Sequence, residues 1–78
     1  MKKFKKNGTY RSLGINGLGR TLWKCVGRSE RASGLTLVKF ESRVGFSQSG
    51  RVKVIDGIET ILCSNVFDGR IVAAVPQK

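Results

Sequence analysis

Residues 35–75 alternate between apolar and polar side chains in short runs, and glycine-containing turns separate these runs. An alternation with a period of two predicts β-strands that bury one face. In the first run, the face expected to be buried holds Val38, Phe40, Val44 and Phe46. A turn over 47–50 precedes a second run, in which Val52 and Val54 are expected to point inward.

Two Asp-Gly pairs mark the second half of this region. Asp56-Gly57 is typical of a two-residue hairpin loop, because both positions of that loop favour a positive φ. The run 58–63 is apolar on both faces, which predicts either a central strand or a strand that another subunit covers. Asp68-Gly69 precedes the final strand. One face of that strand holds Ile71, Ala73 and Val75.

The run 20–26 predicts a further strand, but both of its faces are partly apolar, so the alternation leaves the inward face open. Trp23 in this run is either a core anchor or a platform on which a base stacks, since Arg20 and Lys24 lie near it. The stretch 27–34 is polar and has glycine at both ends, so we expect an exposed loop there.

The first 19 residues are basic and rich in glycine. Clustered like charges resist packing, so we expect a flexible arm that either grips phosphate or only aids solubility. The stretch 14–20 resembles the phosphate loop of glyceraldehyde-phosphate dehydrogenases. The dinucleotide fingerprint needs a third glycine where this chain has Leu22, so we reject a dinucleotide site.

These elements predict an all-β fold, namely a small antiparallel β-barrel or meander of roughly five to six short strands, OB-like or SH3-like in type. The flexible basic arm over 1–19 precedes a small β domain over 20–78. A chain of 78 residues makes one domain with a modest core. We therefore expect a homo-oligomer or a larger assembly to stabilise it.

Charge is unevenly distributed along the chain. The sequence has 15 Lys and Arg against 5 Asp and Glu, which makes the formal net charge +10. Residues 1–39 hold ten of these bases and a single acid, Glu30. Such segregation favours a polyanionic partner, although a basic protein with a merely solvated surface is the alternative.

We expect this partner to be nucleic acid, bound without sequence preference and with single-stranded DNA or RNA favoured. Lys and Arg attract phosphates, and an exposed aromatic ring stacks on unpaired bases. The candidate nucleic-acid-binding residues are Lys2, Lys3, Lys5, Lys6, Arg11, Arg20, Trp23, Lys24, Arg28, Arg31, Lys39, Arg43, Arg51 and Lys53. Further candidates for stacking are Phe4, Tyr10 and Phe46.

Other classes of function lack the residues that they need. The chain has no His and one Tyr, and its five carboxylates are scattered, so we expect no enzyme. Two Cys without His cannot complete a zinc site, so we expect no metal and no cofactor. Cys25 and Cys63 are expected to be free thiols in a reducing compartment, with a disulfide as the alternative.

The expected location follows from two further features. No apolar run approaches the length that crosses a bilayer, and the basic start lacks the apolar stretch of a signal peptide. We therefore expect a protein of the cytoplasm or of a virion interior that is not secreted. We expect neither a membrane nor a small-molecule substrate among its partners.

The end of the chain is Phe67-Asp68-Gly69-Arg70-Ile71-Val72-Ala73-Ala74-Val75-Pro76-Gln77-Lys78. It resembles the end of filamentous-phage single-strand-binding proteins, a resemblance that covers these twelve residues and implies an OB-like dimer. Two other functions stay open from the residues themselves. One is a small structural subunit of a virion or ribonucleoprotein whose arm contacts the genome. The other is an inhibitor that occupies an acidic groove of another protein.

Overall fold

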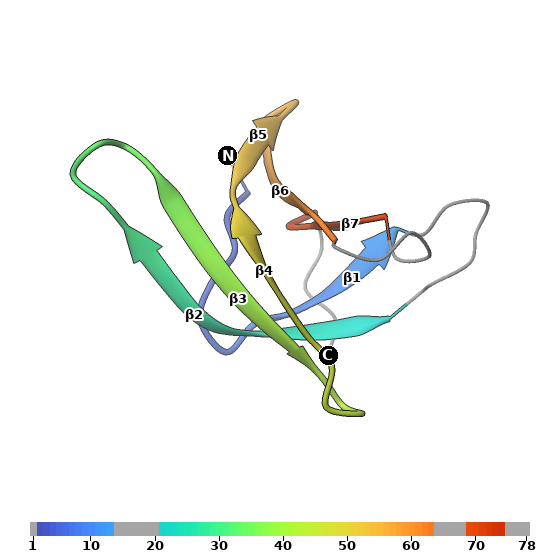
Figure 1. Cartoon of the computed structure of the whole chain (residues 1–78). Helices are drawn as coiled ribbons and strands as arrows, with labels where there is room; N and C mark the ends of the chain where they lie inside the picture. Colours follow the sequence, from blue (N-terminus) through green and yellow to red (C-terminus); the bar gives the residue numbers. More distant parts are fainter. Residues whose placement is uncertain (1, 14–20, 64–68, 75–78) are drawn as a thin grey trace.

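Antiparallel strands form one barrel-like sheet in the computed structural model of the protein (Figure 1). The structure describes residues 2–13, 21–63 and 69–74. Within these residues the seven strands are β1 (Thr9–Leu13), β2 (Leu22–Glu30), β3 (Thr36–Ser42), β4 (Ser47–Arg51), β5 (Lys53–Ile55), β6 (Ile58–Leu62) and β7 (Arg70–Val72). Their order across the sheet is β4-β3-β2-β1-β7-β6-β5. The expected all-β fold is confirmed, with seven strands in place of five to six.

The sheet is nearly closed because its two edges belong to one kinked stretch of chain. β4 and β5 lie at opposite ends of the strand order, yet only Val52 separates them in sequence. The backbone N–H of Val52 donates to the carbonyl of Thr36 at 2.9 Å, which holds the kink against β3. A Cβ atom on Gly50 of β4 would lie 3.9 Å from the Cβ of Ile61 on β6, so these two strands also meet.

The core fills the inside of this barrel. Its buried apolar side chains are Phe4, Tyr10, Trp23, Cys25, Val38, Phe40, Ile61, Ile71 and Ala73. The predicted inward positions of Val38, Phe40, Ile71 and Ala73 are confirmed. The ambiguous run 20–26 points Trp23 and Cys25 inward, because both pair with positions on strands whose inner face is already set. The core interpretation of Trp23 is confirmed by its exposed fraction of 1%.

The segment that precedes β2 is part of the barrel, which corrects the expected arm over residues 2–13. The Phe4 ring is 1% exposed and packs edge-to-face on Tyr10 and Phe40, with centroid distances of 5.0 and 4.9 Å. β1 lies between β2 and β7. The neighbouring lysines stay exposed, so solvent weakens their mutual repulsion while one ring anchors the segment. Residues 14–19 of the expected arm lie outside the described residues.

Two predicted connections differ from the structure. The β3–β4 hairpin turns at 43–46 rather than 47–50, because Gly45 has φ +91° and the Ser42 N–H donates to the Phe46 carbonyl at 2.8 Å. Val44 and Phe46 are therefore exposed instead of buried. The expected loop 27–34 is shorter, since β2 continues to Glu30.

A β-bulge explains why β2 continues. The register with β3 shifts between Cys25 and Gly27, so the alternation of sides changes and Arg28 pairs with the inward-facing Val38. The bulge thus turns a charged side chain toward the barrel interior.

The predicted elements of the second half are largely confirmed. Asp56 and Gly57 both have positive φ and join β5 to β6 in a hairpin, as the Asp-Gly pair predicts. β6 is central, with β5 on one side and β7 on the other. Val52 packs against the core as expected. Val54, also expected inside, pairs with the inward-facing Glu59 but is exposed where the barrel opens.

The burial of Phe4 is testable by truncation. We expect Phe4→Ala to lower the free energy of unfolding by about 3 kcal/mol, because the cavity it leaves lies between two aromatic rings. Urea denaturation followed by far-ultraviolet circular dichroism measures the change. The matched control is Lys5→Ala, one residue away and exposed, with an expected change below about 0.5 kcal/mol. Equal stability of both variants would show that the segment does not pack on the barrel.

Candidate nucleic-acid interface

The outer face of β1 to β4 carries a row of basic side chains. Because Trp23 and Cys25 point inward, Lys24 between them points outward, and the same alternation places Lys39 outward on β3. On β4, Gln48 is buried, so Arg51 falls on the outer side. All three basic side chains are exposed.

The strand register sets the spacing of this row. Lys24 pairs with Glu41, and Lys39 lies two positions from Glu41 on the same face of β3. Lys39 pairs with Ser49, and Arg51 lies two positions from Ser49 on β4. Diagonal neighbours of this kind are about 7–8 Å apart. The row therefore runs obliquely over three strands, and short hydroxyl side chains beside it leave room for a chain of phosphates.

Two further arginines extend this row. Arg11 on β1 is exposed and pairs with Leu22 of β2. Arg43 is exposed in the β3–β4 turn and lines a hollow of about 250 Å³ together with Lys24 and Leu22. We refer to Arg11, Lys24, Lys39, Arg43 and Arg51 together as the basic face. Glu41 is the acid that the strand alternation places among them.

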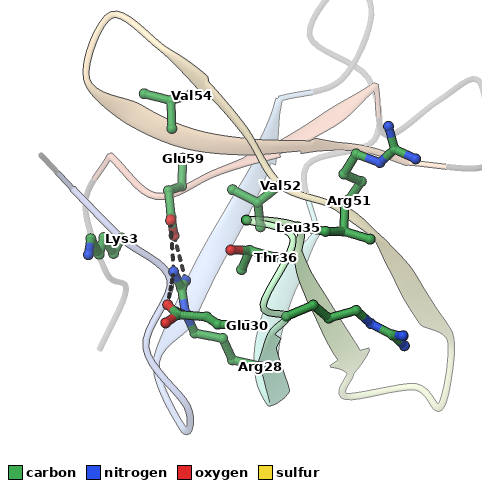
Figure 2. A pocket seen from close by; sticks show the side chains of 11 residues that line it. Lys3, Arg28, Glu30, Leu35, Thr36, Arg51, Val52, Val54 and Glu59 are labelled. Carbon is green, nitrogen blue, oxygen red and sulfur yellow. Dashed lines mark hydrogen bonds and ion pairs between the residues drawn. The ribbon is translucent and has the colours of Figure 1, made fainter.

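Another hollow opens at the mouth of the barrel, with a volume of about 450 Å³ (Figure 2). Arg28 and Glu59 form a two-pronged ion pair inside it. Arg28 Nη1 donates to Glu59 Oε1 at 2.6 Å, and Nη2 donates to Oε2 at 2.9 Å. Arg28 also donates to the Phe4 carbonyl at 3.0 Å and to Glu30 Oε1 at 3.0 Å. The N–H of Phe4 donates to Glu59 Oε1 at 2.8 Å, which completes the network.

This network shifts the pKa values of both charged groups. Hydrogen bonding to Glu59, with a smaller contribution from Glu30, raises the pKa of Arg28 further above its ordinary value. Burial alone would raise the pKa of Glu59. The hydrogen bonds from Arg28 and from the Phe4 N–H, with the charges of Arg28 and Lys3, outweigh burial and hold that pKa below 4.5. Both groups are therefore ionised at neutral pH.

The ion pair inside the barrel-mouth hollow has a structural role. Both oxygens of Glu59 accept hydrogen bonds from Arg28, so this carboxylate is committed to the fold. Arg51 at the rim points away from the ion pair (Figure 2). No nucleophile with an adjacent base lies among the described residues that line the hollow.

The structure separates the sequence-predicted site residues into several groups. Lys24, Lys39, Arg43, Arg51 and Arg11 come together on the basic face. Lys3, Lys5 and Lys6 are exposed before β1, Arg31 follows β2, and Lys53 lies on β5. The Lys2 ammonium donates to the Ala74 carbonyl at 2.7 Å. Arg20 lies outside the described residues.

Two predicted site residues are unavailable to a ligand. Trp23 is buried, so its ring has no face on which a base can stack. The Arg28 side chain is 17% exposed and donates to two glutamates, so it has little capacity left for phosphate. Tyr10 and Phe4, the further stacking candidates, are buried as well. The bulge in β2 and the near closure of the barrel cause these differences, and neither is visible in the alternation of the sequence.

Sequence reasoning did not assign a role to Glu59. It is a carboxylate in the largely apolar and central strand β6, with an exposed fraction of 3%. A buried acid needs a charged partner, so its position in an apolar run was an available signal for an internal ion pair. The partner could not be chosen from sequence, because Arg28 reaches it only through the bulge in β2.

The structure offers little other chemistry in the part of the chain that it describes. Cys25 and Cys63 are not joined by a disulfide, and burial raises the pKa of Cys25. No group of three or more potential metal ligands occurs within residues 2–13, 21–63 and 69–74. Over the same residues, no helix has the length and apolar character that a membrane-spanning helix requires.

The ion pair predicts a defined acid sensitivity. Because the folded state lowers the pKa of Glu59, the pair stabilises the fold above the ordinary value of 4.5, and this stabilisation is lost as pH falls through the lowered pKa. We expect Glu59→Gln to lower the free energy of unfolding at pH 7 by about 3 kcal/mol, since Arg28 loses a buried partner. Urea denaturation at several pH values should also show a flatter acid dependence in this variant.

The control for this prediction is Glu41→Gln, which removes one carboxylate from an exposed position on β3. We expect it to change stability by less than about 0.5 kcal/mol. A Glu59→Gln variant as stable as the wild type at pH 7 would contradict the structural role of the pair.

Comparison with known proteins does not assign a family or a function to this arrangement of residues. No protein-family model, no curated protein and no solved structure matches the chain.

Proposed function

We propose that this protein binds nucleic acid through the basic face, without sequence preference and with single strands favoured. The observation that carries this proposal is the oblique row formed by Lys24, Lys39 and Arg51 on the outer surface of β2, β3 and β4. Exposed cations in a row attract a polyanion, and binding releases the counterions that the phosphates had condensed.

The acids in the described part of the chain do little to neutralise this row. Glu59 and Glu30 both accept hydrogen bonds from Arg28 at the barrel mouth, so their carboxylates are held away from the row. Glu41 is the acid that the strand register places among the cations of the basic face. This arrangement produces a local positive field on the outer face of the barrel. A surface needs charge to be solvated, but it does not need charge of one sign.

The width of the row favours a single strand. The cations follow one line across three strands, which suits one phosphate backbone rather than the two backbones of a duplex. Small barrels of the OB-like and SH3-like types often use a curved outer face in this way, and we propose that this barrel is of that kind. The comparison with these barrels is an analogy of fold alone. The proposal therefore depends on the basic face and not on the comparison.

A second function, a structural subunit of a virion or ribonucleoprotein, is favoured by a different surface. The outer side of β5 to β7 exposes Ile55 and Leu62, the latter with an exposed fraction of 66%. A contiguous exposed apolar patch is typical of a contact with another protein chain. We propose this role, with self-association or assembly through that surface, as the alternative.

Salt dependence tests the proposed function. Fluorescence anisotropy of labelled oligo-dT gives the slope of log affinity against log salt for the wild type and for Lys39→Gln. Removing one single-strand phosphate contact should reduce the magnitude of this slope by about 0.7. A double change, Lys24→Gln with Lys39→Gln, should reduce it by about 1.4.

Lys5→Gln is the matched control, because it removes one charge from an exposed position before β1, outside the basic face. We expect its slope to equal that of the wild type. Equal losses in Lys5→Gln and Lys39→Gln would mean that net charge and not the basic face governs binding. No binding of oligo-dT by the wild type at low salt would exclude the nucleic-acid function.

A further inference from the structure

The turn between β3 and β4 presents an aromatic ring to solvent. The Ser42 N–H donates to the Phe46 carbonyl at 2.8 Å, and the Phe46 N–H donates to Ser42 Oγ at 3.1 Å. Gly45 supplies the positive φ that closes the turn. These bonds hold the backbone of Phe46 in place, while its side chain is 67% exposed and that of Val44 is 75% exposed.

Phe46 differs from every other aromatic residue in the described part of the chain. Phe4, Tyr10, Trp23 and Phe40 are all at most 2% exposed. Burying an aromatic side chain is favourable, so leaving Phe46 exposed forgoes a gain in stability that the fold obtains from four other aromatic rings. The turn that exposes Phe46 also carries Arg43, one of the cations of the basic face.

A hollow lies beside this turn on the outer face of the barrel. It is lined by Leu22 and by the cations Lys24 and Arg43, with Thr9, Glu41 and Ser42 completing it. An apolar side chain between two cations is suited to a flat ring that carries a phosphate on each side. The hollow and the exposed ring therefore lie at the same end of the barrel, where the β3–β4 turn is, while the pairing of Glu41 with Ser47 places Phe46 on the opposite face of the sheet from the row of cations.

We propose that the β3–β4 turn is the base-contacting element of this protein, where Phe46 stacks on an unpaired nucleobase. Arg43, which lies in the same turn, holds the phosphate next to that base. The inference rests on the proposed nucleic-acid function and adds to it the contact that selects single strands. A duplex keeps its bases stacked on one another, so an exposed ring gains a stacking partner only on a strand whose bases are free.

The experiment uses Phe46→Trp as a fluorescent reporter. Trp23 is buried, so wild-type emission should change little when oligo-dT is added. In Phe46→Trp, stacking of the introduced indole should quench the additional emission in a saturable titration at low salt. A duplex of equal charge should bind with much less quenching. Absence of quenching by a bound single strand would overturn the stacking proposal.

Affinity gives a second and independent measurement. Phe46→Leu keeps an apolar side chain but removes the ring, and we expect about a tenfold loss of oligo-dT affinity with an unchanged salt slope. Affinity for the duplex should stay the same. Val44→Ala is the control, because it shortens a neighbouring exposed apolar side chain without removing a ring, and its affinity should match the wild type.

The outcomes separate the two proposals. If the wild type binds oligo-dT and Phe46→Leu binds it equally well, the stacking proposal fails while the nucleic-acid function stands. If the wild type does not bind, both fail. If the emission maximum of Phe46→Trp instead shifts with protein concentration and not with added oligo-dT, the turn is a contact between copies of this chain and the stacking proposal is overturned.

Discussion

The ion pair between Arg28 and Glu59 is the interaction on which the rest of the barrel depends. It joins β2 to β6 at the barrel mouth, and both of its groups bond the backbone of Phe4. Their side chains are 17% and 4% exposed, so neither charge is fully solvated and each needs its partner. One set of charge-assisted hydrogen bonds thus connects three distant stretches of a domain whose core is small.

The same pair influences the surface that we propose to be functional. By binding Glu30 as well as Glu59, Arg28 holds two carboxylates at the barrel mouth. Within the described residues, the strand register places the carboxylate of Glu41 among the cations on the outer side of β2 to β4. The network that stabilises the barrel is therefore linked to the positive field outside it, since two acids that could have masked the basic face are held at the mouth instead.

Several elements could be predicted because their causes are local. Val38 and Phe40 alternate with charged residues, and Asp56-Gly57 supplies the two positive φ values of a tight hairpin. The outward positions of Lys39 and Arg51 follow from the same alternation. Phe4 could not be placed in this way, because its burial depends on contacts with Tyr10 and Phe40, and the surrounding lysines indicate an unpacked segment.

The local alternation of apolar and polar side chains was therefore sufficient to predict the all-β class and most strand positions. The composition was sufficient to predict the excess of positive charge. The alternation could not decide which cations are held inside the barrel, because the bulge after Cys25 turns Arg28 inward and only the nearly closed barrel brings Glu59 to meet it. It also could not decide which ring is exposed, since Trp23 is buried by strands distant in sequence and Phe46 lies at a turn. Alternation is a property of neighbouring residues, whereas burial and ion pairing depend on strands that closure of the barrel brings together.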